Sequence, residues 1–424
     1  MALYRRACVR ALTSLLQLQR PTWVKSLFPI SEATVRGNTV IGQRTLLTDA
    51  YKGTSAWRTR KILATNMDEL KITLDADFFD FKKPVASVDL HKFMDNISDE
   101  HDLKSAEQYL YCHRHSSVAH HLRASTMHSF IRTCLDLGQA DTAVKVLQDK
   151  TNYGVFPDNF TFNLLLDDYL ERGDIKGAAA VAMEMMTLEV LTDEEPLSRL
   201  LALYCCHRYL KSGDSAREVM HDLGMTFADA TRGQTSLLSS SYHALGLVMA
   251  GRLKQAARFL QAEAERTGDG GPCLVQEVVE GLLAVPEEQP DVEEELRGQL
   301  QECVSRLQAE GRISAESLDS LVTTEILPEI QRLQADHTHA EQYPEMLAEW
   351  HRQHVEAVRR QIRAAQEYEM SLKKKKLEKL LEATGGLRYW LQKEERRKAA
   401  ADAEAGKEQS GETTEEQELD KQTV

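Results

Sequence analysis

Glycine, proline and aromatic residues are scarce in this chain. Its 424 residues include 22 glycines and 10 prolines, and aromatic residues make up 6% of the total. Residues that interrupt helices are therefore widely spaced, whereas alanine, leucine and glutamate, which favour helices, are abundant. This composition predicts an all-α fold, built as an extended array of helices.

The sequence also lacks the patterns of common enzyme sites. It contains no phosphate-binding glycine loop, no HExxH segment, no Gly-x-Ser-x-Gly elbow and no paired zinc ligands. The seven cysteines form no CxxC pair, so we expect reduced thiols that are mostly buried. We therefore predict a protein that is not an enzyme, with no catalytic residue, no cofactor and no metal site.

A strong positive charge is missing as well. The formal net charge is -14, which argues against a surface coated in basic residues for indiscriminate nucleic-acid binding. Any contact with nucleic acid must come from a local patch. No apolar run approaches the roughly 20 residues that a membrane-spanning helix needs, so no membrane span is predicted.

An internal repeat occupies the stretch from Thr126 to Asp193. The sequence there matches itself after a shift of 35 residues, and Asp158 falls on Asp193. The other matched pairs are Thr126 with Thr161, Phe130 with Leu165, Ile131 with Leu166, Leu135 with Leu170, Gly138 with Gly173, Ala143 with Ala178, and Val146 with Val181. A period of this length marks a supersecondary unit that buries its apolar face only by stacking on its neighbours.

Each copy of the repeat is predicted to be two helices joined by a turn. In the second copy, apolar residues at helical spacing from Phe162 to Leu170 give the first helix one apolar side, and Gly173 ends it. The second helix, from Ile175 to Met186, has a face of small residues that permits close approach to the first. That face contains Gly177, Ala178, Ala179 and Ala182.

The second copy resembles a known repeat family. The run Pro-Asp-Asn-Phe-Thr-Phe-Asn-Leu-Leu-Leu at 157–166, followed by Gly173, Ala178 and Met185, is similar to the pentatricopeptide repeat of organellar RNA-binding proteins. Within that class, residues 88–195 resemble the pentatricopeptide subunits of the animal mitochondrial small ribosomal subunit. The resemblance implies an α-solenoid of degenerate helix pairs followed by a long charged C-terminal helix.

The same resemblance implies a function in mitochondrial translation. The expected location is the mitochondrial matrix, and the expected role is that of a non-enzymatic, RNA-binding structural component of the ribosome. The implied partners are the small-subunit rRNA and neighbouring mitochondrial ribosomal proteins. Two alternatives stay open, namely a free factor that processes or stabilises other mitochondrial RNA and a helical adaptor that binds only proteins.

The regions flanking the repeats differ in composition. Residues 1–45 are basic and predict a mitochondrial transit peptide, with a basic arm that binds rRNA as the alternative. The expected order of segments is a transit peptide at 1–45, an N-terminal extension at 46–87, repeats at 88–266, further helices at 267–343, a long charged helix or coiled coil at 344–398, and a disordered acidic tail at 399–424.

Two kinds of RNA contact are predicted. In pentatricopeptide proteins, two positions per repeat read a base, and the resemblance places these positions on His128 with Asp158 and on Asn163 with Asp193. The alternative is that both aspartates cap helices while Asn163 faces solvent. Phosphate contacts are favoured over base reading. Their candidate residues are Arg114, Arg123, Arg132, Lys373, Lys374, Lys375 and Lys376.

Two histidine clusters raise the question of metal binding. The first contains Cys112, His113, His115, His120 and His121. It lacks a second cysteine pair, so a solvated turn near RNA or an inert polar loop is the better interpretation. In the second cluster, His351 and His354 lie one helical turn apart, and a solvated helix face is predicted there.

Overall fold

The computed structural model describes residues 46–80, 82–213, 217–265, 271–288, 294–335, 338–384 and 387–408. These residues form two compact units. The first contains the chain up to Lys52 together with Ile131–Thr338, and the second contains Gly53–Phe130 together with the chain from His339 onward. The predicted transit peptide at 1–45 lies outside the described residues.

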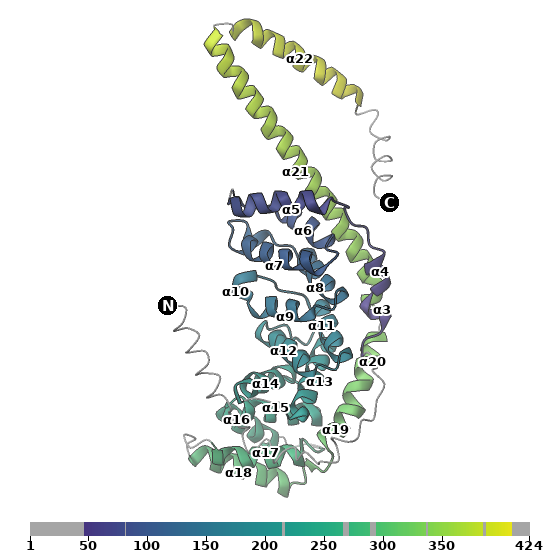
Figure 1. The fold of residues 1–424 in the computed structure, drawn as a ribbon. Coiled ribbons are helices and arrows are strands. Elements are labelled where there is room, and N and C mark those ends of the chain that lie inside the picture. The colour runs from purple at the N-terminus through teal and green to yellow at the C-terminus, as the bar shows by residue number, and fades with distance from the viewer. Residues whose placement is uncertain are drawn as a thin grey trace. The chain divides into compact units, whose positions relative to one another are not determined.

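The first unit is a stack of helix pairs, and consecutive pairs lie next to each other in Figure 1. Helix α8 (Ala124–Asp136) is divided between the two units. The helices that follow it are α9 (Ala140–Gln148), α10 (Lys150–Tyr153), α11 (Asn159–Glu171), α12 (Ile175–Thr187), α13 (Pro196–Ser212), α14 (Arg217–Ala230), α15 (Leu237–Met249), α16 (Leu253–Glu265), α17 (Gln276–Glu288) and α18 (Glu294–Ala309). The predicted all-α solenoid is confirmed.

Short elements complete the first unit. They are α3 (Asp49–Lys52), β1 (Leu274–Val275), β2 (Ile313–Ser314), α19 (Leu318–Leu321), η3 (Val322–Ile326) and α20 (Leu327–Ala335). Strands β1 and β2 pair in parallel, with Leu274 opposite Ile313. The sequence did not predict this pair, because two residues per strand are too few to show an alternating pattern.

The second unit combines the N-terminal helices with the C-terminal ones. Its elements are α4 (Thr54–Arg58), α5 (Met67–Asp75), η1 (Ala76–Asp80), α6 (Ser87–Asp95), α7 (Glu100–Arg114), η2 (Ala119–His121), α21 (Thr338–Thr384) and α22 (Leu387–Glu408). The degenerate helix pair that was predicted from Val88 onward corresponds to α6 and α7. Their apolar faces are buried, with Leu90 and Phe93 on α6 and Tyr109 on α7.

The matched positions of the repeat have matching environments. Ala143 and Ala178 are both fully buried, as are the paired residues Val146 and Val181. Gly138 and Gly173 both follow a first helix with positive φ, at 68° and 71°. The residue after each glycine donates its N–H to a carbonyl five residues earlier, which is the hydrogen bond of a Schellman helix end. Glycine is therefore needed to end each first helix.

Glycines also permit close packing between helices. A Cβ atom on Gly246 of α15 would lie 2.6 Å from the carbonyl oxygen of Gly224 on α14. On α12, a Cβ atom on Gly177 would lie 2.3 Å from a ring carbon of Tyr169. The predicted close approach at the small face of α12 is therefore confirmed.

Hydrogen bonds also join residues about one repeat apart. In the first unit the hydroxyl of Tyr242 lies 2.6 Å from Nδ1 of His207, across 35 residues. In the second unit Thr126 Oγ1 lies 3.1 Å from Nδ1 of His91, again across 35 residues. Polar side chains at the repeat spacing therefore connect neighbouring helix pairs.

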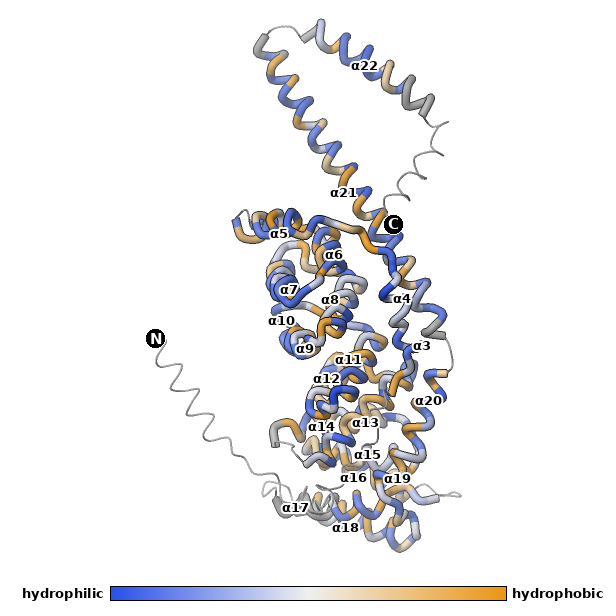
Figure 2. The backbone as a smooth tube through the Cα atoms, turned by 45° about the vertical axis from the view of Figure 1, so that its right-hand side comes forward, coloured by the Kyte–Doolittle hydropathy of each residue, from blue (hydrophilic) through white to orange (hydrophobic). Residues whose placement is uncertain are grey.

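The predicted long charged helix is present as α21, and it begins before Pro344 rather than at it. Pro344 lies beyond the first turn, inside α21, where a proline removes one backbone hydrogen bond and favours a kink. Figure 2 shows blue residues interspersed with orange ones along α21. None of the described helices is apolar over a sufficient length to cross a membrane.

The acidic tail differs from its prediction at its start. Helix α22 continues to Glu408, although disorder was predicted from residue 399. The extra turns are rich in alanine, which has the highest helix propensity, and this outweighs the acidic composition. Residues 409–424 lie outside the described part of the chain.

Candidate nucleic-acid interface

Three of the residues predicted to contact RNA are buried within the protein. Asn163 is 1% exposed, and its Nδ2 donates to the hydroxyl of Tyr51 at 2.8 Å. Arg132 is also buried, and its guanidinium donates to the backbone carbonyl of Lys52 at 2.9 Å. The prediction that these two side chains face RNA or solvent is therefore wrong.

His128 is buried in the second unit. Its Nε2 lies 2.9 Å from the hydroxyl of Tyr343 on α21, and its ring packs edge-on against Trp57. The predicted role of His128 in base reading is contradicted by this burial. All three side chains are buried by a segment outside the repeats. Helix α3 covers Asn163 and Arg132, and α21 covers His128.

The two predicted aspartates are exposed but have different roles. Oδ1 of Asp158 accepts from the backbone N–H of Thr161 at 2.9 Å, so Asp158 caps α11. Asp193 forms an ion pair with Arg199 and does not cap α13. The capping alternative is thus confirmed for Asp158 and wrong for Asp193.

The remaining predicted cations are accessible to different degrees. Arg114 is exposed at the end of α7, and Arg123 is half-buried just before α8. Lys373, Lys374, Lys375 and Lys376 are all exposed on α21. Lys373 pairs with Glu369 at 2.7 Å, and Lys374 lies 3.9 Å from Glu378.

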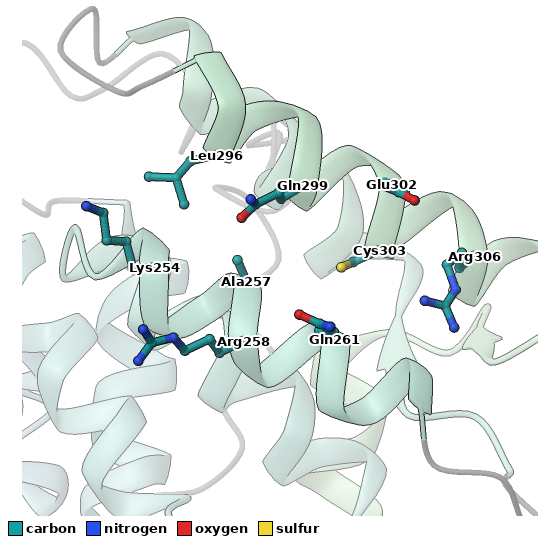
Figure 3. Close-up of a pocket in the computed structure, with 9 residues that line it drawn as sticks. All are labelled: Lys254, Ala257, Arg258, Gln261, Leu296, Gln299, Glu302, Cys303 and Arg306. Atoms are coloured by element: carbon teal, nitrogen blue, oxygen red, sulfur yellow. The ribbon is translucent and has the colours of Figure 1, made fainter.

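A further cationic groove lies between α16 and α18, and the sequence did not predict it. Figure 3 shows Lys254 and Arg258 on one helix and Arg306 on the other around the opening. The cavity has a volume of about 450 Å³. The spacing of Lys254 and Arg258 places them on one face of α16 and was visible in the sequence, but the facing position of Arg306 depends on tertiary packing.

The groove does not contain an activated nucleophile. Cys303 lines it, and burial raises the pKa of this thiol, with a smaller opposing effect from Arg306. The thiol therefore stays protonated at neutral pH and is a poor nucleophile. Glu302 is the acidic residue on the groove wall, so the described side chains around it carry a net positive charge.

The first histidine cluster is divided between surface and interior. His115, His120 and His121 are exposed, as expected for a solvated turn. His113 is 1% exposed, so the prediction is wrong at that position. Its position one turn after Tyr109 and Leu110 puts it on the buried side of α7.

The second histidine pair also departs from its prediction. His351 is half-buried, and His354 is 2% exposed. The predicted solvated face is therefore wrong, because this side of α21 packs against the second unit's other helices.

Comparison with known proteins agrees with the predicted pentatricopeptide repeats. The chain is 27% identical over 225 residues to a mitochondrial pentatricopeptide repeat-containing protein 2 from Xenopus laevis, which covers 46% of this chain and 57% of the relative. It is 33% identical over 79 residues to the Mus musculus protein of that name, covering 19% of this chain and 20% of the relative. The chain thus matches less than two thirds of each relative's length.

A family model matches nearly the whole chain. It is described as mitochondrial 28S ribosomal protein S27, and it matches residues 18–383, which include the repeats and most of α21. The predicted resemblance and the mitochondrial location are confirmed by this match. The chain belongs to the mitochondrial 28S ribosomal protein S27 family.

Proposed function

We propose that the chain is a structural component of the mitochondrial small ribosomal subunit and that it binds the rRNA through phosphate contacts. The family match over residues 18–383 carries this proposal. Burial of Asn163 and His128 supports phosphate contacts over base reading, since neither side chain reaches the surface of the described chain.

The four lysines on α21 are the first proposed phosphate contacts. Consecutive residues of a helix are about 100° apart, so four lysines in a row present charge on every side of α21. Their pairs with Glu369 and Glu378 are solvent-exposed and contribute little, so phosphate oxygens can replace them. Phosphate contacts fix position on RNA without reading its sequence.

The groove between α16 and α18 is the second proposed contact. Lys254, Arg258 and Arg306 are all exposed at its edges. A cationic groove of this kind follows an RNA backbone, and Gln261 and Gln299 offer amide groups to sugar or phosphate oxygens.

The far part of α21 is proposed to contact neighbouring ribosomal proteins. From Ile362 to Leu380 most of its side chains are exposed, and large apolar ones are among them. Tyr368, Met370 and Leu380 are more than half exposed. A protein surface that covers these side chains would remove apolar area from water.

Sedimentation tests the ribosomal role. Mitochondrial lysate is separated on a density gradient at moderate salt, and the chain is quantified against small-subunit proteins. Stoichiometric migration with the small subunit is expected. A chain found only near the top of the gradient would refute the ribosomal role, and RNA binding by that fraction would favour the free RNA-processing alternative.

A titration of the purified chain tests the mode of RNA binding. Replacement of Lys373, Lys374, Lys375 and Lys376 by alanine should weaken binding to every RNA and reduce the dependence on salt. The log–log slope should decrease by roughly 0.7–0.9 for each phosphate that is no longer neutralised. The matched control replaces the same four residues by arginine and should retain the slope. Selective binding of uridine-rich over adenosine-rich RNA by the wild type would instead support base reading.

A further inference from the structure

Three side chains with metal-binding atoms converge in the second unit. His91 and Asp95 lie one turn apart on α6, and His354 lies on α21. One potential ligand atom from each residue lies within 4.8 Å of the other two. Nε2 of His91 is 3.3 Å from Oδ2 of Asp95, and the rings of His91 and His354 have their centroids 4.3 Å apart.

Other residues hold the remaining polar atoms of His91 and Asp95. Nδ1 of His91 lies 3.1 Å from Oγ1 of Thr126, and Oδ1 of Asp95 accepts from the hydroxyl of Ser129 at 2.7 Å. These contacts orient the imidazole and the carboxylate, and they leave Nε2 and Oδ2 directed at each other. Hydrogen bonds of this kind usually support metal ligands in proteins.

The third residue has an unsatisfied atom. Nε2 of His354 is buried and has no hydrogen-bond partner among the described residues. A buried nitrogen without a partner is unfavourable, because nothing replaces the hydrogen bond that it would make with water. A bound ion would supply the missing interaction.

Arg60 is a nearby cation that opposes a bound metal. The guanidinium of Arg60 lies 4.0 Å from Asp95, on the side of Oδ1 rather than Oδ2. It is held over the ring of Trp57 at 3.3 Å from the centroid, and it donates to the carbonyl of Trp57. Arg60 is therefore held beside the cluster by its contacts with Trp57.

A small cavity lies beside His91 and Asp95. A cavity of about 20 Å³ is lined by His91 and Asp95 and also by His351. This volume suffices for one water molecule. In a tetrahedral site with bonds of about 2.0–2.1 Å, ligand atoms are about 3.4 Å apart, close to the 3.3 Å between His91 and Asp95.

We propose that His91, Asp95 and His354 form a Zn²⁺ site that joins α6 to α21. Two imidazoles and one carboxylate are ligands that zinc accepts, with a water molecule completing the tetrahedron from the small cavity. The ion would satisfy Nε2 of His354 and connect two segments that are far apart in sequence. This role is structural and is independent of RNA binding.

Metal content of the full chain tests the proposal. Purified protein is dialysed against Zn²⁺ and then against metal-free buffer, and bound zinc is measured by elemental analysis. One tightly held ion per chain is expected in the wild type. The ion should be absent from His91→Gln and His354→Gln, and Ser129→Ala should bind zinc about 10–100-fold more weakly because a supporting hydrogen bond is removed.

Two control variants separate this site from others. His113→Gln removes a buried histidine on α7 that is not part of the cluster, and it should retain the ion. A double variant with His120→Asn and His121→Asn removes the exposed pair whose rings lie 3.9 Å apart. Zinc that disappears only in the double variant would overturn the proposal, as would a wild type that binds no zinc.

Spectroscopy provides a readout that does not depend on variants folding. Co²⁺ replaces zinc readily, and a tetrahedral Co²⁺ site with nitrogen and oxygen ligands absorbs visible light far more strongly than the hydrated ion. Strong absorption at one equivalent, removed by added Zn²⁺, is expected for the wild type. A spectrum like that of hydrated Co²⁺ would show that the three side chains do not bind the metal.

Discussion

Asp167 on α11 has several polar partners and is completely buried. Its Oδ1 accepts from the backbone N–H groups of Leu46 and Leu47, both at 3.0 Å. Its Oδ2 pairs with Nζ of Lys52 at 2.5 Å. One carboxylate therefore fixes the segment that precedes α3 as well as α3 itself.

Asp167→Ala should lower the free energy of unfolding by about 3–5 kcal/mol, because it leaves buried donors without an acceptor. Urea denaturation of the full chain measures this decrease. Glu329→Ala is the matched control, since Glu329 pairs with Arg332 on the exposed surface of α20, and it should cost about 0–1 kcal/mol. Equal effects of the two variants would show that Asp167 does not fix this segment.

A second carboxylate links stability to pH. The pKa of Asp319 is lowered to about 2, chiefly by its hydrogen bond with His207 and further by Lys211. The folded pKa is below the ordinary value of 3.8, so the interaction stabilises the fold above about pH 4 and is lost as pH falls towards 2. Stability should therefore decrease over that window.

Asp319→Asn should remove this part of the acid dependence. The melting temperature is compared for both proteins between pH 5 and pH 2.5, a range chosen to span roughly the two pKa values. A smaller decrease is expected for the variant. Parallel curves would mean that Asp319 has the same pKa in the folded and unfolded chain.

Prediction from sequence succeeded where the repeat itself sets the environment of a residue. Ala143 and Ala178 are buried because each follows a helix-ending glycine by the same interval. The prediction for Asn163 failed because its partner, Tyr51, is 112 residues away and belongs to no repeat. When a distant segment covers a surface, the local sequence pattern does not show that burial.

At the level of elements, the contact between α14 and α15 depends on two glycines. Inside a helix, glycine is about 0.5–1 kcal/mol less favourable than alanine, so sequence alone marks Gly246 as a weak point. In the structure Gly246 faces the backbone of Gly224, and any side chain would collide with it. The close approach compensates for the poor helix propensity.

Gly246→Ala should therefore destabilise the protein by about 1–3 kcal/mol through overpacking. Gly298→Ala on α18 is the control, because nothing lies within 4 Å of its added Cβ. That change should stabilise by about 0.5–1 kcal/mol. Thermal denaturation distinguishes the two signs, and stabilisation by both variants would place α14 and α15 further apart.

The limits of helices were predicted less well than their existence. Helix α21 starts at Thr338 and continues through Pro344, because the helix-favouring alanine and glutamate residues on either side outweigh one missing backbone donor. Helix α22 reaches Glu408 because alanine dominates its last turns. In both cases the prediction gave too much weight to one residue type, proline in α21 and acidic residues in α22. It gave too little weight to the helix propensity of the neighbouring residues.

At the scale of the whole molecule, charge is unevenly distributed along the chain. Acidic residues exceed basic ones by 66 to 52, yet Glu32 is the only acidic residue in the first 45 positions. The family match confirms mitochondrial location, while import by residues 1–45 is a prediction that depends on their composition.

Residues 1–45 fused to a fluorescent reporter should direct it into mitochondria. A chain that begins at Leu46 should stay in the cytosol. Microscopy and fractionation measure both, and replacement of the arginines in the fused segment by glutamine is the control that should abolish import. Import of the shortened chain would contradict the prediction.

The hydrogen bonds of Gln334 on α20 are expected to form late in folding. Its Oε1 accepts from the backbone N–H of Thr48 at 2.9 Å, and its Nε2 donates to the carbonyl of Leu46 at 2.6 Å. These bonds close a loop of 286 to 288 residues. Loop closure becomes less favourable by about 0.6 kcal/mol for each doubling of length, so local helix pairs should form first.

The segment around Leu46 and Thr48 is synthesised early but is expected to be fixed last. Gln334→Ala should speed unfolding and leave the folding rate nearly unchanged, because the bonds form after the rate-limiting step. Stopped-flow measurements in urea separate the two rates. Slower folding of the variant would mean that this long-range closure precedes the stacking of the repeats. If the closure is late, the order of synthesis and the order of consolidation run in opposite directions along this chain.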